Sequence, residues 1–165
     1  MSDRHGIPQE FPHHRRELHV KVLVIGAGRM GAIRVEDLAA DARVTQVLVT
    51  NRHPDKATDL AAKFGATVVP WDSVATVSAD AAVVAVGTDA HETVLHDILP
   101  RGIPVLCEKP IAMTIAATQK AVDLAARSGS GLQIGFQRRF DESIRAVHEV
   151  IDNGNLGTLY SLTIT

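Results

Sequence analysis

The feature that most constrains this chain is a buried strand that runs into a glycine-rich turn and then into a helix, from Val20 to Gly31. Residues 20–25 (VKVLVI) are largely apolar on both faces, which is typical of a parallel strand covered on both sides. Gly26, Gly28 and Gly31 follow at G-x-G-x-x-G spacing. Gly26 permits the turn, Gly28 lets the backbone approach a pyrophosphate, and Gly31 lets the helix pack closely on the strand. The pattern predicts a dinucleotide site, against the alternative of a turn that only packs an α/β unit.

The start of the following helix supplies the other half of such a site. Free N–H groups of the first helical turn lie at the positive end of the helix dipole, where phosphates bind. We therefore count Arg29 and Met30, with the three glycines, as candidate cofactor-binding residues.

Composition excludes several classes of function. A chain of 165 residues fits one domain, and its net charge of −2 gives no electrostatic case for nucleic acid or a membrane surface. No apolar run approaches the ~20 residues of a membrane span. The N-terminus carries no apolar signal-peptide core, so we expect a cytoplasmic protein.

Residues 1–19 are polar, contain Pro8 and Pro12, and show no helical or strand period, so we expect a disordered leader. His13 and His14 have no partner cluster, and we predict no metal site. Cys107 is the single cysteine, which rules out an internal disulfide. Its apolar neighbours favour a buried structural thiol over a nucleophile.

Strand and helix patterns alternate along residues 20–140. The expected strands are 20–25, 44–50, 67–69, one within 79–86, 103–107 and 131–136. Between them lie helical patterns with recognisable ends: Pro54 suits a first helical position, Thr114 a cap, and Gly65 and Gly129 suit stops. Such alternation predicts a doubly wound parallel α/β sheet, the Rossmann arrangement.

The last part, residues 141–165, follows a different pattern. Phe140 and Asp141 resemble the staple and cap of a helix that would end at Gly154. Residues 158–165 then alternate apolar and polar, which predicts a half-buried strand of an antiparallel sheet. Because a strand with an unpaired apolar face is unstable, we expect a missing second domain, lost by truncation or supplied by another chain.

The residues after the second strand bear on the choice of cofactor. In dinucleotide folds an acidic residue there usually binds the adenosine ribose, but here the position falls to Asn51. A neutral Asn51 removes the carboxylate that would repel a 2′-phosphate, and Arg52 beside it can pair with one. We predict NAD(P), leaning to NADP. The alternative is that NAD is bound, with Asn51 a turn residue and Arg52 a solvated surface charge.

Chemistry is expected beyond the carboxyl ends of the strands, where doubly wound sheets bind ligands. Glu108 and Lys109 follow the fifth strand directly, and a lysine there can donate a proton or a hydrogen bond to a hydroxyl or carbonyl. The alternative is an exposed ion pair between them. Thr88 and His91 leave the fourth strand at the same rim; His91 is also on the inward helical stripe, which favours a packed or capping histidine.

Two arginines follow the sixth strand at the same rim. Arg138 and Arg139 are adjacent, so both are expected to be partly solvated, and one of them could face the cleft.

Four motifs in this order resemble the Gfo/Idh/MocA oxidoreductase family, and its inositol dehydrogenase-like members in particular. They are Gly26–Gly31 (GAGRMG), Cys107–Pro110 (CEKP), Gly135–Asp141 (GFQRRFD) and Gly154–Gly157 (GNLG). The resemblance covers residues 21–165, and the glycine motif alone would not establish it.

The resemblance implies a two-domain enzyme that passes hydride between nicotinamide and a carbon of a sugar or cyclitol. Lys109 matches the family lysine that assists proton transfer, Glu108 and Thr88 match positions that line the cofactor, and Arg138 matches a position near the substrate. His91, which lies at the same rim, is also predicted to contact the cofactor. The second domain often forms the oligomer interface, so a homo-oligomer is expected.

The sequence departs from the family at two points. The family's catalytic Asp and His come from the second domain, so no residue here takes those roles, and Asn51 replaces a common acidic residue. We therefore expect a cofactor-binding domain that is weakly active or inactive alone. One alternative is a non-catalytic NAD(P)-binding sensor or assembly module. Another is a methyl transferase with the same glycine turn, against which the Glu-Lys-Pro motif argues.

Overall fold

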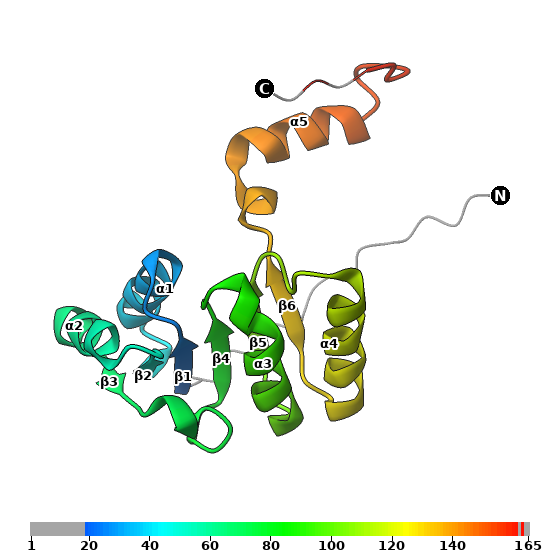
Figure 1. The fold of residues 1–165 in the computed structure, drawn as a ribbon. Coiled ribbons are helices and arrows are strands. Elements are labelled where there is room, and N and C mark those ends of the chain that lie inside the picture. The colour runs from blue at the N-terminus through cyan, green and yellow to red at the C-terminus, as the bar shows by residue number, and fades with distance from the viewer. Residues whose placement is uncertain (1–18, 162, 164–165) are drawn as a thin grey trace. The chain divides into compact units, whose positions relative to one another are not determined.

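The strand–turn–helix feature forms with the predicted bounds. A computed structural model describes residues 19–161 and 163 (Figure 1). In it, β1 is Val20–Ile25 and α1 is Arg29–Ala40. The last four side chains of β1 are buried, as expected for a strand covered on both faces. The expected leader, apart from His19, lies outside the described residues.

The chain divides into two compact units, with the boundary after Val86. In the first unit, β1 pairs in parallel with β2 (Val44–Thr50) on one side and with β4 (Ala81–Val84) on the other. The short β3 (Thr67–Val68) pairs in parallel with the outer side of β2. The glycine turn therefore leaves the sheet from a central strand.

Two helices and one short 3₁₀ helix connect these strands. The second helix, α2 (Pro54–Phe64), starts at Pro54 and ends at Gly65, whose φ of 72° is the left-handed conformation that glycine adopts readily. Between β3 and β4, however, only the 3₁₀ helix η1 (Trp71–Ser73) forms, so the predicted alternation of strand and helix fails at this connection. Pro70 precedes η1, and the Ser73 hydroxyl donates to the Pro70 carbonyl at 2.6 Å, which closes a short turn.

The second unit contains two parallel strands and the two helices that follow β4 and β5. These elements are α3 (Thr88–Ile98), η2 (Leu99–Arg101), β5 (Val105–Glu108), α4 (Ile115–Ser128) and β6 (Leu132–Gly135). The two helices contact each other, and β5 pairs with β6 (Figure 1). The side chain of Thr114 caps α4 by accepting from the Ala117 N–H at 3.1 Å, and Gly129 ends it, as predicted.

The hydrogen-bonded strands follow the order β3-β2-β1-β4-β5-β6, all parallel where their pairing is defined. This is the doubly wound order of the Rossmann fold, and it confirms the predicted fold class. In the described part of the chain, no helix combines the length and the hydropathy that crossing a bilayer requires.

The last described elements are η3 (Gln137–Phe140) and α5 (Glu142–Asp152). Asp141 caps α5 by accepting from the Ile144 N–H at 3.1 Å, as predicted. The strand expected at 158–165 does not form over the described residues 158–161 and 163, and Tyr160 is 92 % exposed. A strand needs a hydrogen-bonded neighbour, and an alternating pattern alone does not supply one. Leu162, Ile164 and Thr165 lie outside the described residues.

The packing of α1 on β1 gives a prediction about stability. A Cβ added at Gly31 would lie 1.9 Å from the Gly26 carbonyl oxygen, so Gly31→Ala must move the backbone. We expect it to lower the free energy of unfolding by about 3 kcal/mol or more, measured by urea denaturation. The control is Gly131→Ala, because a Cβ at Gly131 meets nothing within 4 Å. A Gly31→Ala protein as stable as this control would contradict the assigned packing.

Candidate functional site

The glycine turn is held by the ends of two neighbouring strands. The Gly26 N–H donates to the Thr50 carbonyl at the end of β2 at 2.8 Å. Gly26 has a φ of 113°, and a Cβ there would lie 2.5 Å from the Ala85 carbonyl, just after β4. Only glycine satisfies both constraints, so the chain must turn here, immediately after β1.

The turn presents an open helix N-terminus. Gly28 is the N-cap of α1, and having no side chain it leaves the first-turn N–H groups uncapped. A Cβ at Gly28 would meet nothing within 4 Å, so the space beside the backbone is open. The N–H groups of Arg29, Met30 and Gly31 lie at the positive end of the helix dipole. These features fit a pyrophosphate held by backbone, which the sequence predicts.

The Asn51 side chain forms two hydrogen bonds to the backbone that the sequence did not predict. Its Oδ1 accepts from the Ala27 N–H at 3.1 Å, and its Nδ2 donates to the His53 carbonyl at 3.0 Å. The side chain therefore ties the glycine turn to the loop after β2. Since a primary amide carries two N–H donors, the second one is left for the predicted contact with a ribose oxygen.

The next residue, Arg52, is exposed, and its guanidinium lies over the indole ring of Trp71. Its Cζ is 5.6 Å from the centroid of the Trp71 ring, which η1 supplies from the connection after β3. This contact was missed in the sequence, where no local signal links the two positions.

In the second unit, Thr88 is the first residue of α3, and Gly87 is the N-cap of this helix. His91, one turn later, is only 1 % exposed. Its Nδ1 lies 2.8 Å from the Pro110 carbonyl oxygen. A carbonyl can only accept, so Nδ1 carries the proton and donates. The structure places His91 as a packed histidine that holds the loop after β5.

The Cys107 thiol lies beside this histidine, with Sγ 3.6 Å from Nδ1 of His91. It is fully buried. Burial first, and then the neighbouring Glu108 carboxylate, raise the pKa of the thiol to about 12. A thiol that stays protonated at neutral pH is a poor nucleophile, which confirms the prediction of a structural cysteine.

Glu108 ends β5 and is 7 % exposed. Its register partner on β6 is Gly135, and a Cβ there would lie 3.0 Å from Oε2 of Glu108. Gly135 thus leaves room for the carboxylate. This requirement on the second strand could be found only from the strand pairing.

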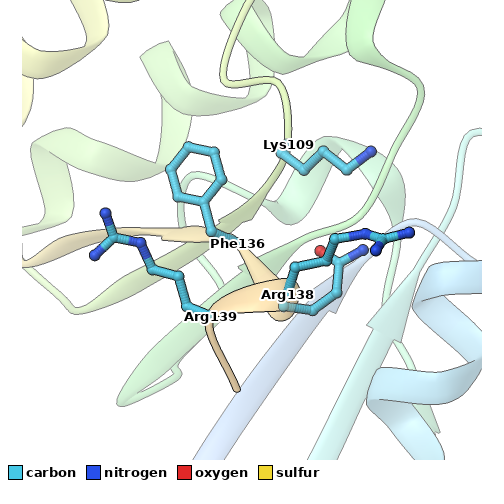
Figure 2. Close-up of a pocket in the computed structure, with 5 residues that line it drawn as sticks. Lys109, Phe136, Arg138 and Arg139 are labelled. Carbon is cyan, nitrogen blue, oxygen red and sulfur yellow. The ribbon is translucent and has the colours of Figure 1, made fainter. Parts of the chain in front are cut away.

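Lys109 lies on a cavity of about 530 Å³ beyond the ends of β5 and β6. The other residues that line it are Phe136, Gln137, Arg138 and Arg139. Figure 2 shows the Arg138 side chain extending to the same side as Lys109, while Arg139 extends to the opposite side. Lys109 and Arg138 can both donate hydrogen bonds to hydroxyl or carbonyl oxygens of a small polar ligand.

Each unit therefore holds part of the predicted site. The first carries the glycine turn, Asn51 and Arg52, and the second carries Thr88, His91, Glu108, Lys109 and Arg138. Over residues 19–161 and 163, no group of three or more side chains is arranged to hold a metal ion.

Comparison with known sequences gives one family. Residues 20–136 match the family described as "Oxidoreductase family, NAD-binding Rossmann fold" (GFO_IDH_MocA). The chain is 30 % identical over 147 residues to an inositol 2-dehydrogenase of Rhizobium meliloti, covering 88 % of this chain and 44 % of that protein. It is 36 % identical over 146 residues to inositol 2-dehydrogenase 1 of Mycolicibacterium vanbaalenii, covering 84 % and 42 %. The chain spans less than half the length of these relatives.

Comparison with solved structures gives similar folds among dehydrogenases of inositols and a protein of gentamicin A biosynthesis. Scyllo-inositol dehydrogenase from Lactobacillus casei, with bound NAD(H) and scyllo-inositol, superposes with a TM-score of 0.77 at 26 % identity, covering 84 % of this chain and 42 % of that one. GenD2 from gentamicin A biosynthesis, in complex with NAD, gives 0.78 at 28 % identity, covering 91 % and 43 %.

Gly28 gives a prediction about the phosphate site. Its φ of −81° and ψ of −169° suit any residue, so Gly28→Val should fold. The added side chain would fill the open space beside the turn and should weaken binding of NAD and NADP about tenfold or more, measured by calorimetric titration. Gly131→Val is the matched control, because it adds the same side chain at an open position elsewhere. Unchanged affinity in a folded Gly28→Val protein would reject the pyrophosphate assignment.

Proposed function

This chain belongs to the Gfo/Idh/MocA family of oxidoreductases, and on that premise we propose that it is the NAD(P)-binding part of a dehydrogenase acting on CH–OH groups. The proposed substrate is a sugar or a cyclitol. Residues 20–140 would form the cofactor domain, and residues 141–165 would lead into a second, substrate-binding domain. That second domain is also the proposed interface of a homo-oligomer.

The observation that carries this proposal is the cavity bordered by Lys109 and Arg138 at the carboxyl ends of β5 and β6. Ligands of doubly wound sheets bind at this edge. Oxidation of an alcohol removes a proton from the hydroxyl and a hydride from the carbon. When bound, the nicotinamide ring supplies the hydride chemistry. Lys109 would hold the reacting oxygen by a hydrogen bond and assist transfer of its proton, and Arg138 would orient a neighbouring hydroxyl.

Two further observations support a cofactor in the first unit. The uncapped N-terminus of α1 and the open space at Gly28 suit a pyrophosphate. Asn51 brings no negative charge to the ribose position, and Arg52 stands next to it with its side chain exposed. We therefore propose a preference for NADP over NAD, with Arg52 pairing with the 2′-phosphate.

Replacing Arg52 tests the cofactor preference. Arg52→Ala should cost about 1–3 kcal/mol of NADP binding free energy and leave NAD binding nearly unchanged, because only NADP carries the 2′-phosphate. Calorimetric titrations with both cofactors measure the difference. Arg145→Ala, which removes an exposed arginine of α5, is the control for loss of charge. Equal weakening of both cofactors, or of neither, would reject the contact.

Replacing Lys109 tests the reaction. In the protein purified at the full length of its natural gene product, Lys109→Met should lower kcat for polyol oxidation about 100-fold or more, with cofactor affinity within about twofold. A panel of cyclitols and sugars, followed by nicotinamide absorbance, gives the rates. Lys120→Met is the control, since Lys120 forms an exposed pair with Glu92 at 3.7 Å on the helical surface.

The comparison of Lys109→Met with Lys120→Met has three possible outcomes. Loss of rate in Lys109→Met alone supports the dehydrogenase. Equal rates in both variants would remove Lys109 from the mechanism. Cofactor binding with no turnover on any polyol would favour the non-catalytic NAD(P)-binding module.

A further inference from the structure

The contact between Arg52 and Trp71 joins two connections of the first unit. Arg52 lies in the loop between β2 and α2, and Trp71 opens η1 after β3. The guanidinium carbon is 5.6 Å from the centre of the indole ring, within the range of a cation–π interaction. Arg52 is exposed and Trp71 is half-buried.

The indole ring belongs to a segment that is fixed to the sheet. The Val69 N–H donates to the Val49 carbonyl of β2 at 3.0 Å, just before η1. The Ser73 N–H donates to the Pro70 carbonyl at 3.1 Å, and Val74 is buried directly after η1. The ring therefore belongs to a segment that backbone hydrogen bonds attach to β2, whereas Arg52 is a long, exposed side chain.

The N–H edge of the guanidinium remains available for a ligand. The five N–H donors of a guanidinium lie in its plane, and a guanidinium that stacks on an aromatic ring keeps them free for hydrogen bonds. Within the described part of the chain, Arg52 forms no ion pair, although Asp55 and Asp72 are near it in sequence. The N–H donors of Arg52 are therefore not used by a carboxylate of the described residues.

We propose that Trp71 is a positioning residue for the adenosine 2′-phosphate, and that its indole ring holds Arg52 with the N–H edge directed at that phosphate. This inference rests on the proposed preference for NADP. Restricting a long side chain before binding reduces the entropy lost on binding. Since an exposed cation–π contact is weak, its removal should cost about two- to fivefold in affinity.

Trp71 is the single tryptophan of the chain, so its fluorescence reports on this position alone. The probes are adenosine 2′,5′-bisphosphate and adenosine 5′-monophosphate, which differ only in the 2′-phosphate. We expect saturable changes in Trp71 fluorescence with the bisphosphate, and tighter binding of the bisphosphate than of the monophosphate.

Variants of Trp71 distinguish a role in positioning Arg52 from a role in folding. Trp71→Leu should weaken the bisphosphate two- to fivefold by calorimetry and leave the monophosphate unchanged. In an Arg52→Ala background the same substitution should have no effect on either probe. Trp71→Phe keeps an aromatic face and much of the volume, so it should lose less affinity, and it decides the question if Trp71→Leu does not fold.

The outcomes separate this inference from the function it rests on. If the natural chain prefers the bisphosphate but neither Trp71 variant changes that preference, the role of Trp71 is wrong while NADP preference stands. Equal weakening of both probes would mean that Trp71 serves the adenosine or the fold, which also overturns the inference. If the natural chain binds both probes equally, the 2′-phosphate site itself is wrong.

Discussion

The first unit depends on the close packing of the Gly31 backbone against the carbonyl oxygen of Gly26, because a Cβ added at Gly31 would lie 1.9 Å from that oxygen. This contact brings the first turn of α1 directly against the end of β1. It depends in turn on the positive φ of Gly26, which lets the chain reverse beside Ala85. The helix N-terminus is thereby fixed at the edge of the sheet, with Gly28 facing open space. This packing leaves the N–H groups of the first turn of α1 uncapped at the end of β1, where the proposed phosphate site requires them.

In the second unit, the residues on both sides of Lys109 are held in place by contacts with neighbouring elements. On one side, the buried Glu108 carboxylate occupies space that Gly135 leaves open on β6. On the other side, His91 donates to the Pro110 carbonyl from inside α3. With both neighbours held, the exposed Lys109 side chain is the part of this loop that is free to meet a ligand. Pre-organisation of this kind would lower the cost of orienting Lys109 in the proton transfer proposed for it.

Local signals in the sequence predicted most of the secondary structure, including the cap at Thr114 and the first strand–turn–helix unit, because caps and glycine turns act over a few residues. The contacts that shape the site were not predictable in this way. The pairing of Arg52 with Trp71 depends on which connections follow neighbouring strands, and the space that Gly135 gives to Glu108 depends on strand register. Neither the topology of the connections nor the register of the strands can be read from local sequence patterns.

The central claim is that this chain binds a dinucleotide through the backbone of its glycine turn. Amide NMR of the ¹⁵N-labelled chain, titrated with NADP, tests it most directly, because each N–H reports separately. We predict that the amides of Gly28, Arg29, Met30 and Gly31 shift on binding and become protected from solvent exchange, with Gly131 unaffected. Binding that leaves these four amides unchanged, or no binding at millimolar cofactor, would contradict the account.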